Sequence, residues 1–153
     1  MNTVNSLLKP VVILMADDDA DDRLLAKDAL AECRMPGEIH FVENGEELVD
    51  YLHKRGKFAA LPSPRPGIIL LDLNMPRKDG REALREIKAD PSLRRIPVVI
   101  LTTSRADTDI GKAYDLGANS FIAKPASFDS LVEVMKSICR YWMEIVELPE
   151  QKP

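Results

Sequence analysis

The chain of 153 residues has only two cysteines, and it lacks any apolar run long enough to cross a membrane. Cys33 and Cys139 stand alone in helical patterns, without the spacing of a zinc knuckle or a disulfide framework, so we interpret them as small buried residues in a reducing compartment. No basic segment followed by an apolar stretch opens the chain, which excludes an ordinary secretion signal. A membrane-spanning helix needs about 20 apolar residues. We therefore expect a cytoplasmic protein that does not enter a membrane.

An excess of positive charge is absent as well, because 21 Lys and Arg residues stand against 25 Asp and Glu residues, for a net charge of −4. Direct binding to nucleic acid normally depends on a basic surface, so we do not expect nucleic acid as a direct partner. The chain also lacks a glycine-rich loop ending in Lys-Ser or Lys-Thr, which excludes a P-loop nucleotidase.

Short apolar runs alternate with segments of helical period, a pattern typical of a doubly wound parallel sheet. We predict one flavodoxin-like α/β domain with five helices and strand order 2-1-3-4-5. The predicted strands are 11–16, 39–42, 68–73, 98–101 and 120–123. We place the domain at residues 10–144, after an N-terminal extension of residues 1–9 and before a C-terminal tail of residues 145–153. In the first helix, the residues at core-facing spacing are Leu24, Leu25, Ala29 and Leu30.

The last predicted helix, residues 127–144, has an apolar stripe wider than one face of a sheet needs. Tyr141 lies in the widened part of this stripe, next to Trp142. We expect both residues to contact another chain; the alternative is that they close the edge of the core. Residues 56–67 contain three prolines and two glycines and form a loop longer than most compact domains use.

Five aspartates occupy six positions directly after the first predicted strand: Asp17, Asp18, Asp19, Asp21 and Asp22. Asp72 directly follows the apolar run of residues 68–71, at the end of the central predicted strand. Because the carboxyl ends of parallel strands meet at one edge of a sheet, we expect Asp17, Asp18 and Asp72 to share a crevice. We assign the other three acids to capping and to the first turn of the next helix.

Thr102 and Lys124 directly follow the fourth and fifth predicted strands, so the same crevice should hold a hydroxyl donor and a positive charge. Clustered carboxylates repel one another unless a cation neutralises them, and an oxygen-only ligand set favours Mg²⁺. A bound Mg²⁺ with a free position accepts a phosphoryl oxygen. These residue types therefore suit a phosphoryl group, and Asp72, between metal and lysine, fits best as its acceptor.

From about residue 11 to residue 140 the chain resembles the receiver domain of two-component response regulators. Asp17-Asp18 is similar to the acidic pair of that family, and residues 71–76 are similar to the segment around its phosphoaccepting aspartate. Asp79-Gly80 is similar to the turn that follows this segment. The remaining matches are Thr102 for the switch hydroxyl residue, Phe121 for the switch aromatic residue and Lys124-Pro125 for the lysine-proline pair.

The resemblance implies that Asp72 accepts a phosphoryl group from a phosphohistidine of a sensor histidine kinase. It also implies a Mg²⁺ ion held by Asp18, Asp72 and the backbone carbonyl of Asn74, with Asp17 acting through water. The chain would then be a signalling protein, with no enzymatic activity beyond modifying and demodifying itself.

The same resemblance implies that phosphorylation moves Thr102 toward the phosphoryl group and Phe121 inward, which changes a surface near the fourth and fifth helices. Pro125 is a candidate cis proline, because that isomer would aim Lys124 into the site. Since nothing follows Pro153, we expect no attached effector domain, so the signal must leave through the surface of this domain.

More narrowly, segments 56–67, 75–82, 118–121 and 141–149 resemble stand-alone regulators paired with bacterial and cyanobacterial phytochromes. This resemblance implies a phytochrome-type kinase as partner. It also implies a homodimer formed through the C-terminal helical region, with Tyr141 and Trp142 as candidate contacts.

Two alternatives are weighed against this interpretation. A haloacid-dehalogenase-like Mg²⁺ phosphatase also uses a strand-end aspartate, and Asp17-Asp18-Asp19 satisfies half of its signature, but Asp21 occupies the place of its threonine or valine. Asp72 would have no role in such an enzyme. The second alternative is a pseudo-receiver, a binding module that accepts no phosphate, and the complete set of acids, hydroxyl and lysine argues against it.

Overall fold

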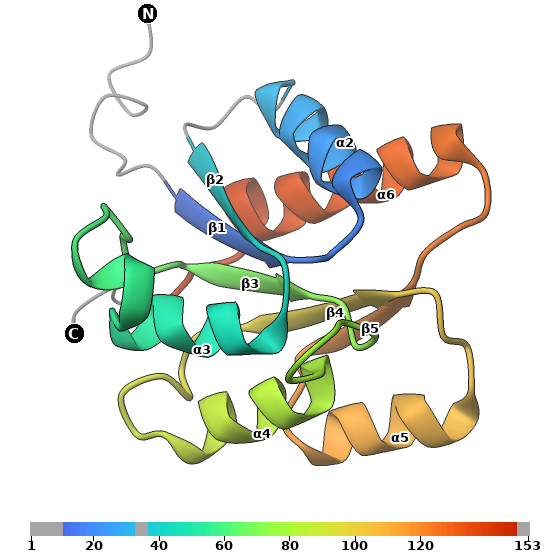
Figure 1. Cartoon of the computed structure of the whole chain (residues 1–153). Helices are drawn as coiled ribbons and strands as arrows, with labels where there is room; N and C mark the ends of the chain where they lie inside the picture. The colour runs from blue at the N-terminus through green and yellow to red at the C-terminus, as the bar shows by residue number, and fades with distance from the viewer. Residues whose placement is uncertain (1–10, 33–36, 150–153) are drawn as a thin grey trace, which may run out of the picture.

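The computed structural model describes residues 11–32 and 37–149, and Cys33 and the N-terminal extension lie outside these ranges. The described residues form one parallel sheet in the order β2-β1-β3-β4-β5, so the predicted fold class and strand order are confirmed (Figure 1). The strands are β1 (Val11–Ala16), β2 (Gly37–Val42), β3 (Ile68–Leu71), β4 (Val98–Thr102) and β5 (Ser120–Ala123). The central strand ends two residues before its predicted end, at Leu71 rather than residue 73.

Helices cover both faces of the sheet (Figure 1). α2 (Ala20–Ala31) and α6 (Phe128–Cys139) pack on one face, and α3 (Gly45–His53), α4 (Gly80–Ala89) and α5 (Asp107–Asp115) pack on the other. Successive residues of β1 alternate between the two cores, because Leu14 joins the core under α3 and α4 while Met15 joins the core under α2 and α6. A strand buried on both faces requires a continuous apolar run, which is the pattern in the sequence.

Polar side chains fix where the helices begin. The Asp19, Asn44, Asp79 and Ser127 side chains each accept a backbone N–H from the first turn of the helix that follows. In α2 the prediction for Leu24 is wrong, because its side chain is 60% exposed whereas Ala26 is buried. The helix has to pack against both the sheet and α6, and this turns its buried stripe toward Ala26.

The long segment between α3 and β3 is packed onto the domain. Residues Gly56–Ala59 form a short 3-10 helix, η1, and Phe58 is buried with its ring edge against Tyr51 at 5.3 Å between centroids. The Tyr51 hydroxyl donates a hydrogen bond of 2.8 Å to the Pro64 carbonyl, and burial raises the pKa of Tyr51 to about 12. The proline-rich segment is thereby fixed at the end of the sheet opposite the acidic residues.

The chain continues beyond α6 as one π-helical segment, η2 (Arg140–Ile145), one residue past the predicted end of the last helix. Met143 is buried, and its methyl group fills the space that a Cβ at Gly37 would need. Trp142 is partly buried against the same core, whereas Tyr141 is 50% exposed.

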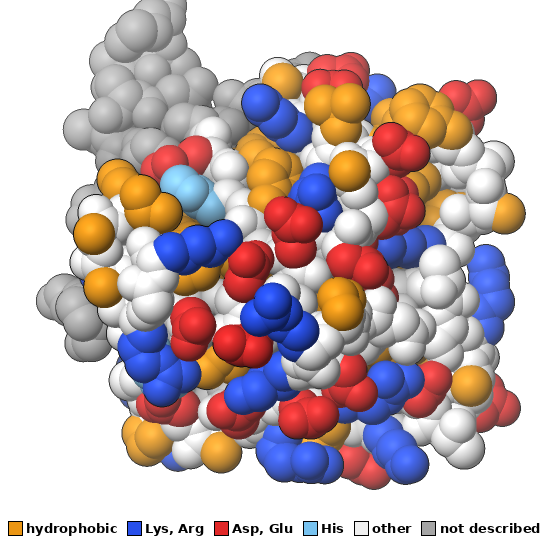
Figure 2. Space-filling model, viewed as in Figure 1, with side chains coloured by type: hydrophobic (Ala, Val, Ile, Leu, Met, Phe, Trp, Pro, Cys, Tyr) orange, Lys and Arg blue, Asp and Glu red, His pale blue; other side chains and the backbone are white. Residues whose placement is uncertain are grey.

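No helix among residues 11–32 and 37–149 combines the length and apolar character that crossing a membrane requires. On the face shown in Figure 2, Lys and Arg side chains are interspersed with Asp and Glu side chains over the region of α3 and α4. Basic side chains do not gather into one patch on that face.

Candidate functional site

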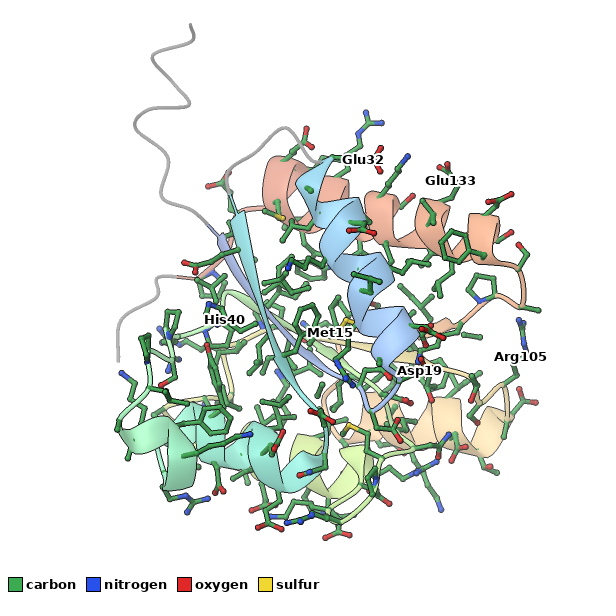
Figure 3. The ribbon with its side chains drawn as sticks, turned by 45° about the horizontal axis from the view of Figure 1, so that its top comes forward. Met15, Asp19, Glu32, His40, Arg105 and Glu133 are labelled. Atoms are coloured by element: carbon green, nitrogen blue, oxygen red, sulfur yellow. The ribbon has the colours of Figure 1, made fainter. Side chains whose placement is uncertain are left out.

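Three carboxylates meet where β1 and β3 end. Asp17 and Asp18 follow β1, Asp72 follows β3, and one oxygen from each lies within 4.8 Å of the others. Asp17 and Asp72 are buried, whereas Asp18 is exposed. Figure 3 shows the start of α2, marked by Asp19, on the same side of the molecule as the loop that carries Arg105. The structure thus brings the three predicted acids together at one open edge of the sheet.

The Asp72 carboxylate is oriented by two donors. Thr102 Oγ1 donates a hydrogen bond of 2.7 Å to Asp72 Oδ1, and the Asn74 backbone N–H donates one of 3.1 Å to the same oxygen. The other oxygen, Oδ2, lies 3.6 Å from Lys124 Nζ. One carboxylate oxygen is therefore held in place, and the other faces the ammonium group.

The Lys124 ammonium is buried among acids. Its Nζ donates a hydrogen bond of 2.6 Å to Asp17 Oδ2 and one of 2.8 Å to Asp22 Oδ2. Burial disfavours the charged ammonium, but the hydrogen bonds to Asp17 and Asp22 outweigh burial and raise the pKa of Lys124 above its ordinary value. The contact with Asp22 was missed, because we assigned this acid only to the first turn of α2.

Burial raises the pKa of Asp17 from 3.8 to about 6, although Lys124 and the Asp19 N–H both favour the charged form. The negative charge of Asp72 acts in the same direction as burial. Such a carboxylate is satisfied either by a proton or by a nearby cation. Together with Asp18 and Asp72 it supplies only oxygen ligands, which fits a hard divalent ion such as Mg²⁺ or Mn²⁺.

The raised pKa of Asp17 predicts that any binding of a divalent cation such as Mg²⁺ at these acids weakens in acid. A proton on Asp17 must leave before the carboxylate helps to hold the ion, so the affinity should fall about tenfold per pH unit below pH 6 from this group alone. Calorimetric titration with Mg²⁺ at pH 5 to 8, in buffers of different ionisation enthalpy, would measure both the affinity and the proton release.

Asp17→Asn is the control for this prediction, because its side chain has a similar shape but does not titrate. Proton release attributable to this position should vanish in the variant. Proton release in the variant equal to that of the unaltered chain would contradict the assignment. The stability of the metal-free chain should depend on pH in the opposite direction to the metal affinity. Because the pKa of Asp17 is raised in the folded state, this group stabilises the fold fully below about pH 4, and that stabilisation is lost as pH rises through about 6.

Of the predicted switch residues, Thr102 contacts Asp72 directly, whereas Phe121 packs against the core. Thr102 is fully buried, and Phe121 is partly buried against the core beneath α3, α4 and α5. The Phe121 backbone N–H donates to the Tyr114 hydroxyl at 3.2 Å. In the loop after β4, Ser104 Oγ donates a 2.6 Å hydrogen bond to Asp109. The other carboxylate oxygen of Asp109 forms an ion pair with Arg81 in α4.

The prediction of a cis peptide bond before Pro125 is wrong, because the described residues contain no cis peptide bond. Lys124 reaches the acids without that isomer. Its backbone N–H donates a 2.7 Å hydrogen bond to the Thr102 carbonyl, which extends the pairing of β4 with β5 and sets the direction of the side chain.

Tyr141 and Trp142 do not contribute to the acidic site. They line a groove of about 620 Å³ along α6 and β5, which also contains Ile122, Val134 and Ile138. The two aromatic rings meet edge to face at 5.4 Å. A second hollow, of about 550 Å³, adjoins Lys124 and is lined by Thr103, Arg105 and Phe128 among others.

Known proteins share both the sequence and this fold. A family model described as the response regulator receiver domain matches residues 13–136. The response regulator Rcp1 of Synechocystis sp. is 39% identical over 140 residues, which cover 92% of this chain and 94% of that protein. The crystal structure of the Mn²⁺-bound form of Rcp1 has a TM-score of 0.88, with 39% identity, and covers 92% of this chain and 100% of that chain. The crystal structure of the phosphorylated cyanobacterial phytochrome response regulator RcpA has a TM-score of 0.87 and 42% identity, and covers 93% of this chain and 100% of that chain.

Proposed function

We propose that this chain, which belongs to the response regulator receiver family, accepts a phosphoryl group on Asp72 from a phosphohistidine of a sensor histidine kinase. The observation that carries this proposal is the setting of Asp72, a buried carboxylate bonded to Thr102 and facing Lys124 beside two further acids. The signalling domain is proposed to span residues 10–144, which include the matched segment 13–136, and to act in the cytoplasm.

The transfer follows from the two oxygens of Asp72. Oδ1 is held by Thr102 and Asn74, so Oδ2 is the oxygen positioned to attack the phosphorus. A bond forms between Oδ2 and phosphorus, the bond from phosphorus to the histidine nitrogen breaks, and its electron pair returns to the imidazole. Lys124 balances the negative charge that collects on the phosphoryl oxygens.

The metal proposed for the site is Mg²⁺, held by Asp18, Asp72 and the backbone carbonyl of Asn74, with Asp17 acting through water. When bound, it would neutralise the acids and orient a phosphoryl oxygen. Two observations support this choice: the all-oxygen ligand set of this chain, and the Mn²⁺ ion bound by the similar protein Rcp1.

Phosphorylation is proposed to act through Thr102 and Phe121. The Thr102 hydroxyl donates to Asp72 Oδ1 in this structure and would turn to a phosphoryl oxygen, leaving space into which Phe121 moves. The affected surface would lie on α5, β5 and α6. The kinase is proposed to be of the phytochrome type, because the chain is similar to RcpA, a phytochrome response regulator.

Incubation with acetyl phosphate and Mg²⁺ tests the proposed function directly. We expect one phosphoryl group per chain, labile to base and to hydroxylamine and dependent on Mg²⁺, and borohydride reduction should convert Asp72 to homoserine, which peptide mass mapping detects. Sustained release of phosphate, continuing after Asp72 is replaced, would support the phosphatase instead. Absence of labelling from both acetyl phosphate and a phytochrome-linked kinase would leave a binding module.

We further propose that the chain forms a homodimer through the groove that contains Tyr141 and Trp142. A half-exposed tyrosine stacked edge to face on a tryptophan is typical of a contact surface.

Sedimentation equilibrium should give a dimer mass for the phosphorylated chain. Tyr141→Asp should reduce this mass to that of a monomer, because the substitution would bury a charge in the contact. Leu61→Asp, at a similarly exposed apolar residue elsewhere, should leave the dimer intact. Equal monomer masses for the phosphorylated and unmodified chains would contradict self-association.

A further inference from the structure

A fourth carboxylate, Asp22, reaches the acidic site from α2. Lys124 Nζ lies 2.6 Å from Asp17 and 2.8 Å from Asp22, but 3.6 Å from Asp72 Oδ2. A separation of 3.6 Å is too long for a hydrogen bond. The ammonium is therefore hydrogen-bonded to Asp17 and Asp22, and it is not hydrogen-bonded to Asp72, the residue proposed to receive the phosphoryl group.

The position of Asp22 is fixed by the first turn of α2. The Asp19 side chain accepts the backbone N–H groups of Asp21 and Asp22, which holds this turn against the site. The Asp22 side chain is 20% exposed and the Lys124 side chain 6%, so their ion pair is largely removed from water. Hydrogen bonds between charged groups are strong in such surroundings.

We propose that Asp22 is a positioning residue that holds the Lys124 ammonium away from Asp72 and thereby weakens the affinity of the site for a phosphoryl group. This inference rests on the proposed function of Asp72 as phosphoacceptor. An ammonium has three N–H donors, and two of them are committed to Asp17 and Asp22. Contact with a phosphoryl oxygen on Asp72 requires the ammonium to move toward it, and the hydrogen bond to Asp22 opposes that movement.

Asp22→Asn should strengthen binding of a phosphoryl group. The amide keeps the size of the side chain but loses the charge, so Lys124 is released toward Asp72 and a negative charge beside an incoming anion is removed. Beryllofluoride is a tetrahedral analogue of a phosphoryl group on an aspartate. At saturating Mg²⁺ we expect its affinity to rise roughly three- to tenfold, the range of one ordinary hydrogen bond, because the amide in Asp22→Asn can still accept from Lys124 but no longer holds it by charge. The half-life of the phosphorylated form should lengthen as well.

Asp21→Asn is the matched control, since it makes the same chemical change one residue away on an exposed side chain. It should leave the beryllofluoride affinity and the half-life of the phosphorylated form unchanged. This result would show that the effect of Asp22→Asn does not come from the mere loss of one negative charge near the site. Asp22→Glu, which restores the carboxylate, should return the affinity toward that of the unaltered chain. A readout independent of phosphorylation is the NMR signal of the Lys124 ammonium, which should shift in Asp22→Asn and not in Asp21→Asn.

The possible outcomes distinguish a failure of the positioning role of Asp22 from a failure of the proposed function of Asp72. If the unaltered chain is labelled on Asp72 but Asp22→Asn binds beryllofluoride no better than Asp21→Asn does, the positioning role is overturned and the proposed function stands. An ammonium signal that is the same in both variants has the same consequence. If the unaltered chain is neither labelled nor able to bind beryllofluoride, the proposed function fails, and this inference fails with it.

Discussion

Asp72→Asn is expected to abolish labelling by acetyl phosphate and by a histidine kinase. An amide does not form a stable acyl phosphate, so the variant offers no acceptor at the one position where Thr102 and Lys124 converge. The substitution is close to isosteric. Asparagine keeps an oxygen that can accept the hydrogen bonds from Thr102 and from the Asn74 N–H, so the surrounding geometry should persist. The expected signal in an intact-mass measurement is therefore the unmodified chain alone.

Loss of labelling through unfolding is separable from loss of the acceptor. Without a metal, Asp72 is one of three carboxylates whose oxygens lie within 4.8 Å, so removing its charge relieves repulsion. The thermal midpoint of metal-free Asp72→Asn should be no lower than that of the unaltered chain. Asp21→Asn, which removes an exposed charge, should be labelled normally. Full labelling of Asp72→Asn, mapped to Asp17 or Asp18, would show that another acid is the acceptor.

The sheet and the meeting of the acids could be predicted because both depend on features that short segments encode. A strand buried on both faces needs a continuous apolar run, and residues 11–16 and 120–123 were placed with their observed ends. Parallel strands end at one edge, so an acid after β1 and an acid after β3 must approach each other once the strand order is given. Neither step requires knowledge of side-chain directions.

Features that depend on side-chain direction or on small energy differences were not predicted. The contact of Asp22 with Lys124 joins residues 102 positions apart and depends on how the first turn of α2 faces the site. The burial of Ala26 in place of Leu24 depends on α6, which packs across α2. The bond before Pro125 keeps the trans isomer, which an X–Pro bond favours by only about 1 kcal/mol, and a difference that small does not fix the isomer from the sequence.

Gly80→Ala is expected to destabilise the fold and, at the same time, to displace the backbone of Asp72. A Cβ at Gly80 would lie 2.3 Å from the carbonyl oxygen of Asp72 and 2.7 Å from the Cα of Leu73, and both are backbone atoms that cannot rotate away. The Gly80 N–H also donates a 2.9 Å hydrogen bond to the Leu73 carbonyl, so α4 begins directly against the turn that follows β3. An alanine must push α4 away from that turn. We expect a loss of about 2–3 kcal/mol in the free energy of unfolding, as for other overpacked sites.

Gly111→Ala is the matched control, because a Cβ at Gly111 meets nothing within 4 Å and the residue lies inside α5. Alanine is favoured over glycine in a helix by about 1 kcal/mol, so the same substitution should stabilise the chain here. Urea denaturation measures both changes, which should have opposite signs. Labelling with acetyl phosphate, without urea and at a temperature where both variants are folded, should be slowed only in Gly80→Ala, because only there does the shift reach the backbone of Asp72. Equal stability and equal labelling of the two variants would mean that the turn after β3 yields to α4 at no cost, and that the position of Asp72 does not depend on this contact.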